Sequence, residues 1–255
     1  MTFVSDFSDS VSLRLRAIDQ FAEAGGLDRA IDLMVAGIDG DGLLQAFGTG
    51  HSEAFAMEIA GRAGGLIPSH AIRLRDLVLL GGRELSSLDA AETERDPSIA
   101  DQLYELYDIR PADVFLIASN SGVNGSVVGV ALRARAEGHP VIAVTSLEHS
   151  GRVASKHPSG LKLSDIADVV IDNRAPYGDG ALALAGGLRA GAVSSITAAY
   201  IAQLLTIGTA QRFVDRSETP PLYLSANTPE GDGHNSALEA RYGARIKAYA
   251  SASAK

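Results

Sequence analysis

Short apolar runs alternate with longer amphipathic segments along most of the chain. Four of these runs predict strands, because continuous apolar stretches of this length are typical of strands buried on both faces. They are "LLQAF" at 43–47, "DVFLIAS" at 113–119, "PVIAVTS" at 140–146 and "ADVVID" at 167–172. The segments at 52–64 and 125–138 have the spacing of crossover helices. The alternation therefore predicts a three-layer α/β/α protein with a parallel sheet.

The first forty residues have a different pattern. "VSLRLRAIDQFAEA" and "DRAIDLMVAGI" carry apolar residues at helical spacing, and "GGL" stands between them. The apolar runs that predict strands begin only after "DGD". We therefore expect an N-terminal helical arm at 1–40 and a single main domain at 41–255.

Other segments give less definite patterns. "LRDLVLL" at 74–80 fits either a strand or a short helix, and "PPLYLSAN" fits a strand or an extended segment. Residues 182–208 form a long apolar stretch that predicts one buried helix or a pair of helices. A closing helix is expected at 234–249.

Composition narrows the classes of function. The chain has 255 residues, no cysteine and a net charge of −9, which disfavours a general electrostatic grip on nucleic acid. No stretch reaches the ~18 apolar residues of a membrane span. The N-terminus lacks the apolar core of a secretory signal. We expect a cytoplasmic protein with neither a nucleic-acid nor a membrane partner.

The segment "SNSGVNGS" at 119–126 follows a predicted strand and opens a predicted helix. Gly122 and Gly125 would let backbone N–H groups approach a ligand closely. The helix adds its positive N-terminal end, so the segment predicts a phosphate site, although no lysine follows as in a P-loop. A capped helix start is the alternative, since serine and asparagine are common caps. The polar side chains on offer are Ser119, Asn120, Ser121 and Asn124.

An earlier glycine-rich turn, "GTGHSE" at 48–53, superficially resembles a dinucleotide-binding fingerprint. That fingerprint requires a glycine where Glu53 stands, and an acidic residue about 20 positions later. The sequence "SHAIRLRD" provides no clear acidic candidate there. A carboxylate would also repel a phosphate. We therefore expect this turn to face uncharged hydroxyl groups, and no nucleotide or other cofactor is predicted.

The order of these motifs resembles that of the SIS (sugar isomerase) domain family. "FGTGHS" before a helix, and then "DVFLIASNSGVNGSVVGVALRARAEGHPVIAVTS", follow the family's sequence of strand, loop and helix. "RAGG", "ADVVIDN", "PYGD" and "SAN" with a later "HN" resemble bacterial SIS proteins described as phosphosugar-binding proteins or sugar isomerases. The resemblance spans roughly residues 30 to 210.

This resemblance implies a five-stranded parallel sheet of flavodoxin-like type. It implies that Ser119, Asn120, Ser121 and Asn124 bind the phosphate of a sugar phosphate. The first loop would bind the sugar through Thr49, Gly50, His51 and Ser52. It also implies assembly as a homodimer or homotetramer, with sites near the subunit interfaces. The expected role is a sugar-phosphate (aldose–ketose) isomerase of carbohydrate metabolism.

Isomerisation through an enediol requires a base that moves a proton between neighbouring carbons. Glu58 and Arg62 have i, i+4 spacing on the helix after the first loop. They fit either a base held by an arginine or a simple surface pair. Phosphoheptose isomerases and muramic acid phosphate etherases place a catalytic glutamate on this helix. A gapless register puts Arg62 at that place, with Glu58 one turn earlier.

Two further residues are candidates for catalysis. Glu94 lies in "DAAETERD", where related SIS proteins bring an acidic loop to the sugar, although acids also suit a helix start. His234 opens the last predicted helix, and other SIS isomerases use a histidine from a late helix, sometimes of a neighbouring subunit. An exposed histidine without a role is the alternative. His234 is retained because imidazole suits proton transfer near neutral pH.

Alternatives to isomerisation remain open at this point. A lyase, etherase or deaminase acting on an amino-sugar phosphate begins with the same proton abstraction. A non-catalytic phosphosugar sensor would need only the binding residues. Asp172 and Asp179 do not have the spacing of a metal motif, and neither do His51, Glu58 and His234, so no metal is predicted.

Overall fold

A computed structural model describes residues 2–88 and 91–246 of the chain. Its centre is a parallel sheet in which five strands lie in the order β2-β1-β3-β4-β5. The strands are β1 (Leu44–Gly48), β2 (Ser69–Ile72), β3 (Val114–Ala118), β4 (Val141–Thr145) and β5 (Val169–Asp172). The prediction of a five-stranded parallel α/β sheet is therefore confirmed, and the four apolar runs are β1, β3, β4 and β5.

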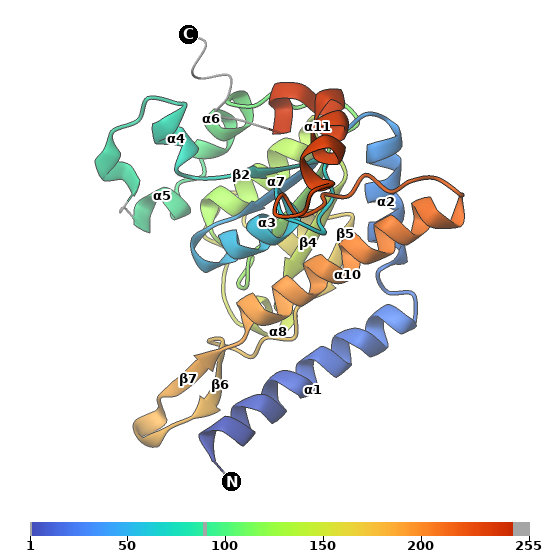
Figure 1. The fold of residues 1–255 in the computed structure, drawn as a ribbon. Helices are drawn as coiled ribbons and strands as arrows, with labels where there is room; N and C mark the ends of the chain where they lie inside the picture. Colours follow the sequence, from blue (N-terminus) through green and yellow to red (C-terminus); the bar gives the residue numbers. More distant parts are fainter. Residues whose placement is uncertain (1, 89–90, 247–255) are drawn as a thin grey trace.

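Helices cover both faces of the sheet (Figure 1). Side chains alternate along each strand, so that Leu116 of β3 packs in one core and its neighbours Phe115 and Ile117 pack in the other. The first core is shared with α2 (Asp28–Asp39), α3 (Glu53–Ile59) and α10 (Ser194–Asp215). The second is shared with α4 (Asp76–Leu79), α6 (Ile99–Glu105), α7 (Gly125–Ala136) and α9 (Leu163–Ile166). Two-sided burial explains why the strands lack polar alternation.

Shorter elements complete the described chain. The helices are α5 (Ala91–Arg95), α8 (Leu147–Gly151) and α11 (Gly231–Tyr242). Single 3-10 turns are η1 (Gly50–Ser52), η2 (Leu85–Leu88), η3 (Ala185–Gly187) and η4 (Gly243–Ile246). Within the described ranges, no helix combines the length and apolarity needed to cross a membrane.

A helix and a hairpin extend from the body side by side (Figure 1). Helix α1 (Phe3–Glu23) buries only Ile18 fully, whereas α2 packs into the core of the domain. The hairpin consists of antiparallel strands β6 (Gly180–Ala183) and β7 (Arg189–Ala192). The predicted helix over 182–208 is therefore wrong in its first part and confirmed from Ser194 onward. Gly186 and Gly187 both have positive φ, which reverses the chain where a helix would have continued.

The structure also assigns the 74–80 segment and the C-terminal helix. The 74–80 segment contains helix α4, and the second strand is the preceding "SHAI", for which no strand was predicted. The closing helix begins at Gly231 and ends at Tyr242, where Gly243 adopts a positive φ that terminates a helix. The remainder of the prediction, 247–249, lies outside the described residues.

A buried ion pair fixes the C-terminal segment to the amino ends of β1 and β3. The Asp113 carboxylate is fully buried and accepts hydrogen bonds from Leu43 N and Gln45 Nε2, each at 2.8 Å. Arg245, whose side chain is 7% exposed, donates to the same carboxylate at 2.7 Å. The carboxylate thus links two strand starts to η4. Buried carboxylates of this kind depend on their partners, because an isolated buried charge is costly.

Removing the guanidinium should therefore destabilise the fold. We expect Arg245→Met to lower the free energy of unfolding by about 3 kcal/mol, because Asp113 loses its buried counter-ion. Arg241→Met is the matched control, since its pair with Asp41 has side chains 55% and 69% exposed. That pair should contribute at most about 1 kcal/mol. Urea unfolding measures both values, and equal losses in the two variants would contradict this account.

Candidate functional site

A cavity of about 310 Å³ lies at the carboxyl edge of the sheet. Open α/β sheets bind ligands at this edge. Six of the eight predicted binding residues line the cavity, namely Thr49, Ser52, Ser119, Asn120, Ser121 and Asn124. Gly48 of β1 pairs in register with Ala118 of β3, so the two loops leave the sheet side by side. The structure therefore brings the predicted sugar-facing and phosphate-facing loops together.

The first loop turns back tightly on itself. A Cβ atom on Gly48 would lie 2.3 Å from the carbonyl oxygen of Ser52, so only glycine fits there. Gly50 has φ +55°, and a Cβ there would lie 2.9 Å from Glu94 Oε1. His51 and Ser52 line a smaller cavity that also includes Asn173 and Ser194. His51 therefore lies beside the main cavity rather than in its lining.

The second loop leaves the start of α7 uncapped. Asn124 has the backbone conformation of an N-cap, but its side chain makes no capping hydrogen bond. Its Nδ2 donates to Glu94 Oε2 and its Oδ1 accepts from Lys156 Nζ, both at 3.3 Å. The alternative interpretation of Asn124 as a simple cap therefore does not hold. The Asn124 side chain thus satisfies none of the first N–H groups of α7, and the dipole of a helix favours an anion at such an end.

Gly125 has a role different from the one expected. A Cβ there would lie 2.0 Å from the carbonyl oxygen of Arg95, so the glycine permits close packing of α5 against α7 rather than approach of a ligand. Ser126 Oγ donates to the carbonyl oxygen of Glu94 at 2.6 Å and fixes the same contact. Glu94 is consequently held between the two loops. Gly122 has φ +66°, and its N–H donates to Ser119 Oγ at 3.1 Å, which shapes the loop.

Four residues of the cavity lining were not predicted from the sequence, and two of them, Lys156 and His149, carry ionisable side chains. Lys156 N donates to the carbonyl oxygen of Val123 at 2.9 Å, so this loop brings a lysine to the side of the cavity that Val123 and Asn124 line. His149 also lines the cavity, and its Nδ1 accepts from Gly178 N at 3.3 Å. In the neutral ring the proton is therefore on Nε2. Neither residue belongs to a local motif, because each reaches the cavity only through the tertiary fold.

The other two catalytic candidates lie elsewhere in this chain. Glu58 accepts hydrogen bonds from Arg62 and from Gln203 Nε2, the latter at 2.8 Å, and is absent from the cavity lining. His234 Nε2 lies 2.9 Å from the carbonyl oxygen of Leu222. It belongs to α11, whose Tyr242 packs on Leu43 and Ile67 before the first two strands. Of the three candidates, only Glu94 contacts a residue of the lining.

Carboxylates near the site have structural partners. Asp179 Oδ1 accepts from Ser194 N at 2.8 Å and so caps α10. Asp172 accepts from Leu147 N at 3.2 Å and pairs with Arg174. Within 2–88 and 91–246, no group of three or more histidine, aspartate or glutamate side chains is arranged to hold a metal ion.

Residues 6–146, more than half of the chain, match the family model of the SIS domain. The chain is 38% identical over 210 residues to a UPF0309 protein of Listeria monocytogenes, covering 82% of this chain and 83% of the relative. A UPF0309 protein of Brucella canis is 35% identical over 245 residues, with 95% and 97% covered. These relatives align over most of their length, so the likeness extends across the described domain.

Solved structures share the fold at low identity. A phosphoheptose isomerase from Francisella tularensis has a TM-score of 0.53 and 17% identity, covering 83% of this chain and 100% of its own. The enzyme from Neisseria gonorrhoeae has a TM-score of 0.51 and 20% identity, with 83% and 96% covered. An Escherichia coli protein solved as a ligand complex has a TM-score of 0.50 and 15% identity, with 82% and 88% covered.

The packing at Gly125 gives a test that compares two helical glycines. We expect Gly125→Ala to lower the free energy of unfolding by about 1–3 kcal/mol, because the new Cβ must displace the Arg95 backbone. Gly233 of α11 has nothing within 4 Å of the corresponding Cβ position. Gly233→Ala should leave stability unchanged or raise it by up to about 1 kcal/mol. Thermal and urea unfolding distinguish the variants, and a stable Gly125→Ala protein would refute the close contact.

Proposed function

The chain belongs to the SIS domain family, together with the UPF0309 proteins, and on that premise we propose that it binds a sugar phosphate and isomerises it. The observation that carries the proposal is the cavity at the carboxyl edge of the sheet. It combines an uncapped helix start, a polar loop and a lysine. A phosphate monoester is the small ligand that these groups suit best.

The phosphate would lie at the start of α7. Ser119, Asn120, Ser121 and Asn124 offer hydroxyl and amide groups, and Lys156 offers a positive charge from the opposite loop. Each hydrogen bond to the charged phosphate would contribute about 1.5–3 kcal/mol. Lys156 now donates to Asn124, and a phosphate could replace that neutral acceptor with a charged one.

The sugar would extend toward the first loop. Thr49 and Ser52 line the same cavity and offer hydroxyl groups to the sugar. Gly50 and His51 complete the proposed sugar-binding loop, where Gly50 lies against Glu94. Glu94 is therefore our first choice for the base, because its carboxylate lies between the proposed sugar and phosphate subsites. It would take the proton from the carbon beside the carbonyl to give an enediol, and return it to the former carbonyl carbon while a proton passes from one oxygen to the other.

Glu58 and His234 could act on the sugar only if another part of the assembly brought them to the cavity. None of the three candidates lines the cavity within one chain, but Glu94 contacts the lining residue Asn124, whereas Glu58 bonds to Arg62 and Gln203 and His234 bonds to Leu222. We propose that the protein acts as a homodimer or homotetramer in which a neighbouring subunit brings Glu58 or His234 to the cavity. Without such an arrangement, Glu94 is the one proposed base that contacts the described lining, which favours a second function, a phosphosugar sensor that binds without turnover.

Binding can be tested directly. We expect Ser121→Ala and Lys156→Met each to weaken binding of a sugar phosphate by about tenfold, since each loses a charge-assisted hydrogen bond of roughly 1.4 kcal/mol or more. Ser236→Ala is the control, because this serine is exposed on α11. Calorimetric titration with a panel of sugar phosphates gives the dissociation constants. Equal affinity in all three variants would count against the proposed site.

Turnover can be tested separately with the same ligands. In D2O, an isomerase should exchange the proton beside the carbonyl of its best ligand, and Glu94→Gln should reduce the rate by about 100-fold or more. Glu92→Gln is a matched control, since it makes the same change on the same short helix. Binding without exchange would establish the sensor. Release of ammonia or of a leaving group would identify a deaminase or a lyase.

A further inference from the structure

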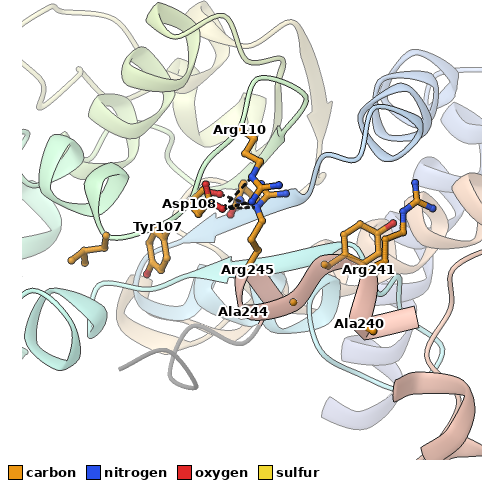
Figure 2. Close-up of a pocket in the computed structure, with 11 residues that line it drawn as sticks. Tyr107, Asp108, Arg110, Ala240, Arg241, Ala244 and Arg245 are labelled. Carbon is orange, nitrogen blue, oxygen red and sulfur yellow. Dashed lines mark hydrogen bonds and ion pairs between the residues drawn. The ribbon is translucent and has the colours of Figure 1, made fainter. Parts of the chain in front are cut away.

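A second cavity, of about 430 Å³, lies at the opposite edge of the sheet (Figure 2). We call it the amino-edge pocket. It is lined by Gln45, Leu106, Tyr107, Asp108, Arg110 and 240–245. Gln45 stands near the start of β1, and Thr49, just beyond the end of the same strand, lines the proposed sugar-phosphate site. The two cavities are therefore separated by the length of one strand and cannot share a small ligand.

Three arginine side chains line this pocket. Arg110 comes from the connection between α6 and β3, Arg241 from the last turn of α11, and Arg245 from η4. Asp108 is the one carboxylate in the lining, and it pairs with Arg110 and Arg245. Arg241 pairs with Asp41 and Arg245 also pairs with Asp113, so each arginine already has a carboxylate partner. The guanidinium groups of Arg110 and Arg241 are suited to bind an anion, because each can donate two parallel hydrogen bonds. Arg245 already donates to Asp113 and to the carbonyl oxygen of Asp108.

Two of the three arginines have partners that a ligand could replace. Arg110 pairs with Asp108 at 2.6 Å, but both side chains are more than half exposed. Arg241 pairs with Asp41, which is also largely exposed. Exposed pairs of this kind contribute only about 0–1 kcal/mol, so an anionic ligand can compete for the guanidinium groups. Arg245 differs, because its buried pair with Asp113 fixes its position at the base of the pocket.

The rest of the lining suits an organic ligand rather than a bare ion. Leu106, Ala240 and Ala244 offer apolar surface, and Tyr107 offers a ring. The volume falls within the range of about 300–1,000 Å³ that is usual for small-molecule sites. Figure 2 shows Arg110, Asp108 and Arg245 close together and Arg241 apart from them.

We propose that the amino-edge pocket is a second ligand site, which binds a small organic anion carrying phosphate or carboxylate groups. Arg110 and Arg241 exchange their surface carboxylates for the ligand, and Arg245 holds the base of the pocket in place. A ligand in the amino-edge pocket would contact both the C-terminal elements α11 and η4 and the loop that precedes β3. The site is independent of the proposed sugar-phosphate chemistry, because no residue of its lining contributes to the other cavity.

The test uses pyrophosphate and citrate as probes of the two anion types, titrated calorimetrically into the Ser121→Ala protein. This background weakens the site at the carboxyl edge, and the comparison with the arginine variants below assigns the remaining binding to one cavity or the other. We expect at least one probe to bind, and Arg110→Gln combined with Arg241→Gln to weaken that binding by about tenfold or more. Arg212→Gln is the control, since Arg212 also pairs with surface aspartates but lies outside both cavities.

Three outcomes would overturn the proposal: no heat with either probe, unchanged affinity in the double variant, or an equal loss in the Arg212→Gln control. Thermal unfolding checks that the double variant is folded, which its exposed side chains lead us to expect. If it does not fold, Arg110→Lys with Arg241→Lys keeps both charges and should still weaken binding, because lysine lacks the bidentate fork. If the amino-edge proposal fails, the sugar-phosphate proposal still stands. That proposal is tested by comparing sugar-phosphate binding in the parent chain, where Ser121 is intact, with binding in the carboxyl-edge variants.

Discussion

The parallel register between β1 and β3 is the constraint on which the candidate site depends. Leu44 pairs with Val114 at one end and Gly48 pairs with Ala118 at the other, so both strands finish level. Because they run in the same direction, both following loops emerge at the same edge and each leads into a helix. Asp113 and Arg245 hold the opposite ends of these strands. A shift of the register by one residue would move Thr49 away from Ser119. It would also turn the side chains of the shifted strand toward the opposite core.

The sequence predicted the parts of the molecule that have a local signal. Strands buried on both faces appear as unbroken apolar runs, so β1, β3, β4 and β5 could be recognised. Loops that end such strands in glycine, serine and asparagine identified six residues of the cavity lining. The family resemblance was confirmed by the SIS domain match and by relatives that align over most of the chain.

The remaining features depend on contacts between distant segments. Strand β2 contains Ser69 and His70, whose polar side chains find buried partners and hide the strand pattern. The hairpin at 180–192 is rich in alanine, leucine and glycine, a composition that also suits a helix. Lys156 and His149 join the cavity through loops that no local motif brings together. Glu94 was expected near the sugar, but its contact with Asn124 follows only from the packing of α5 on α7.

We propose that a sugar phosphate binds between the two loops at the carboxyl edge of the sheet. Backbone amide spectra recorded by 1H–15N NMR, with and without a sugar phosphate that the protein binds, can locate the ligand. We expect large chemical-shift changes at 49–52 and 119–126, with the N–H groups at the start of α7 among them, and smaller changes with the unphosphorylated sugar. Changes confined to other segments, or equal changes with both ligands, would exclude this binding mode.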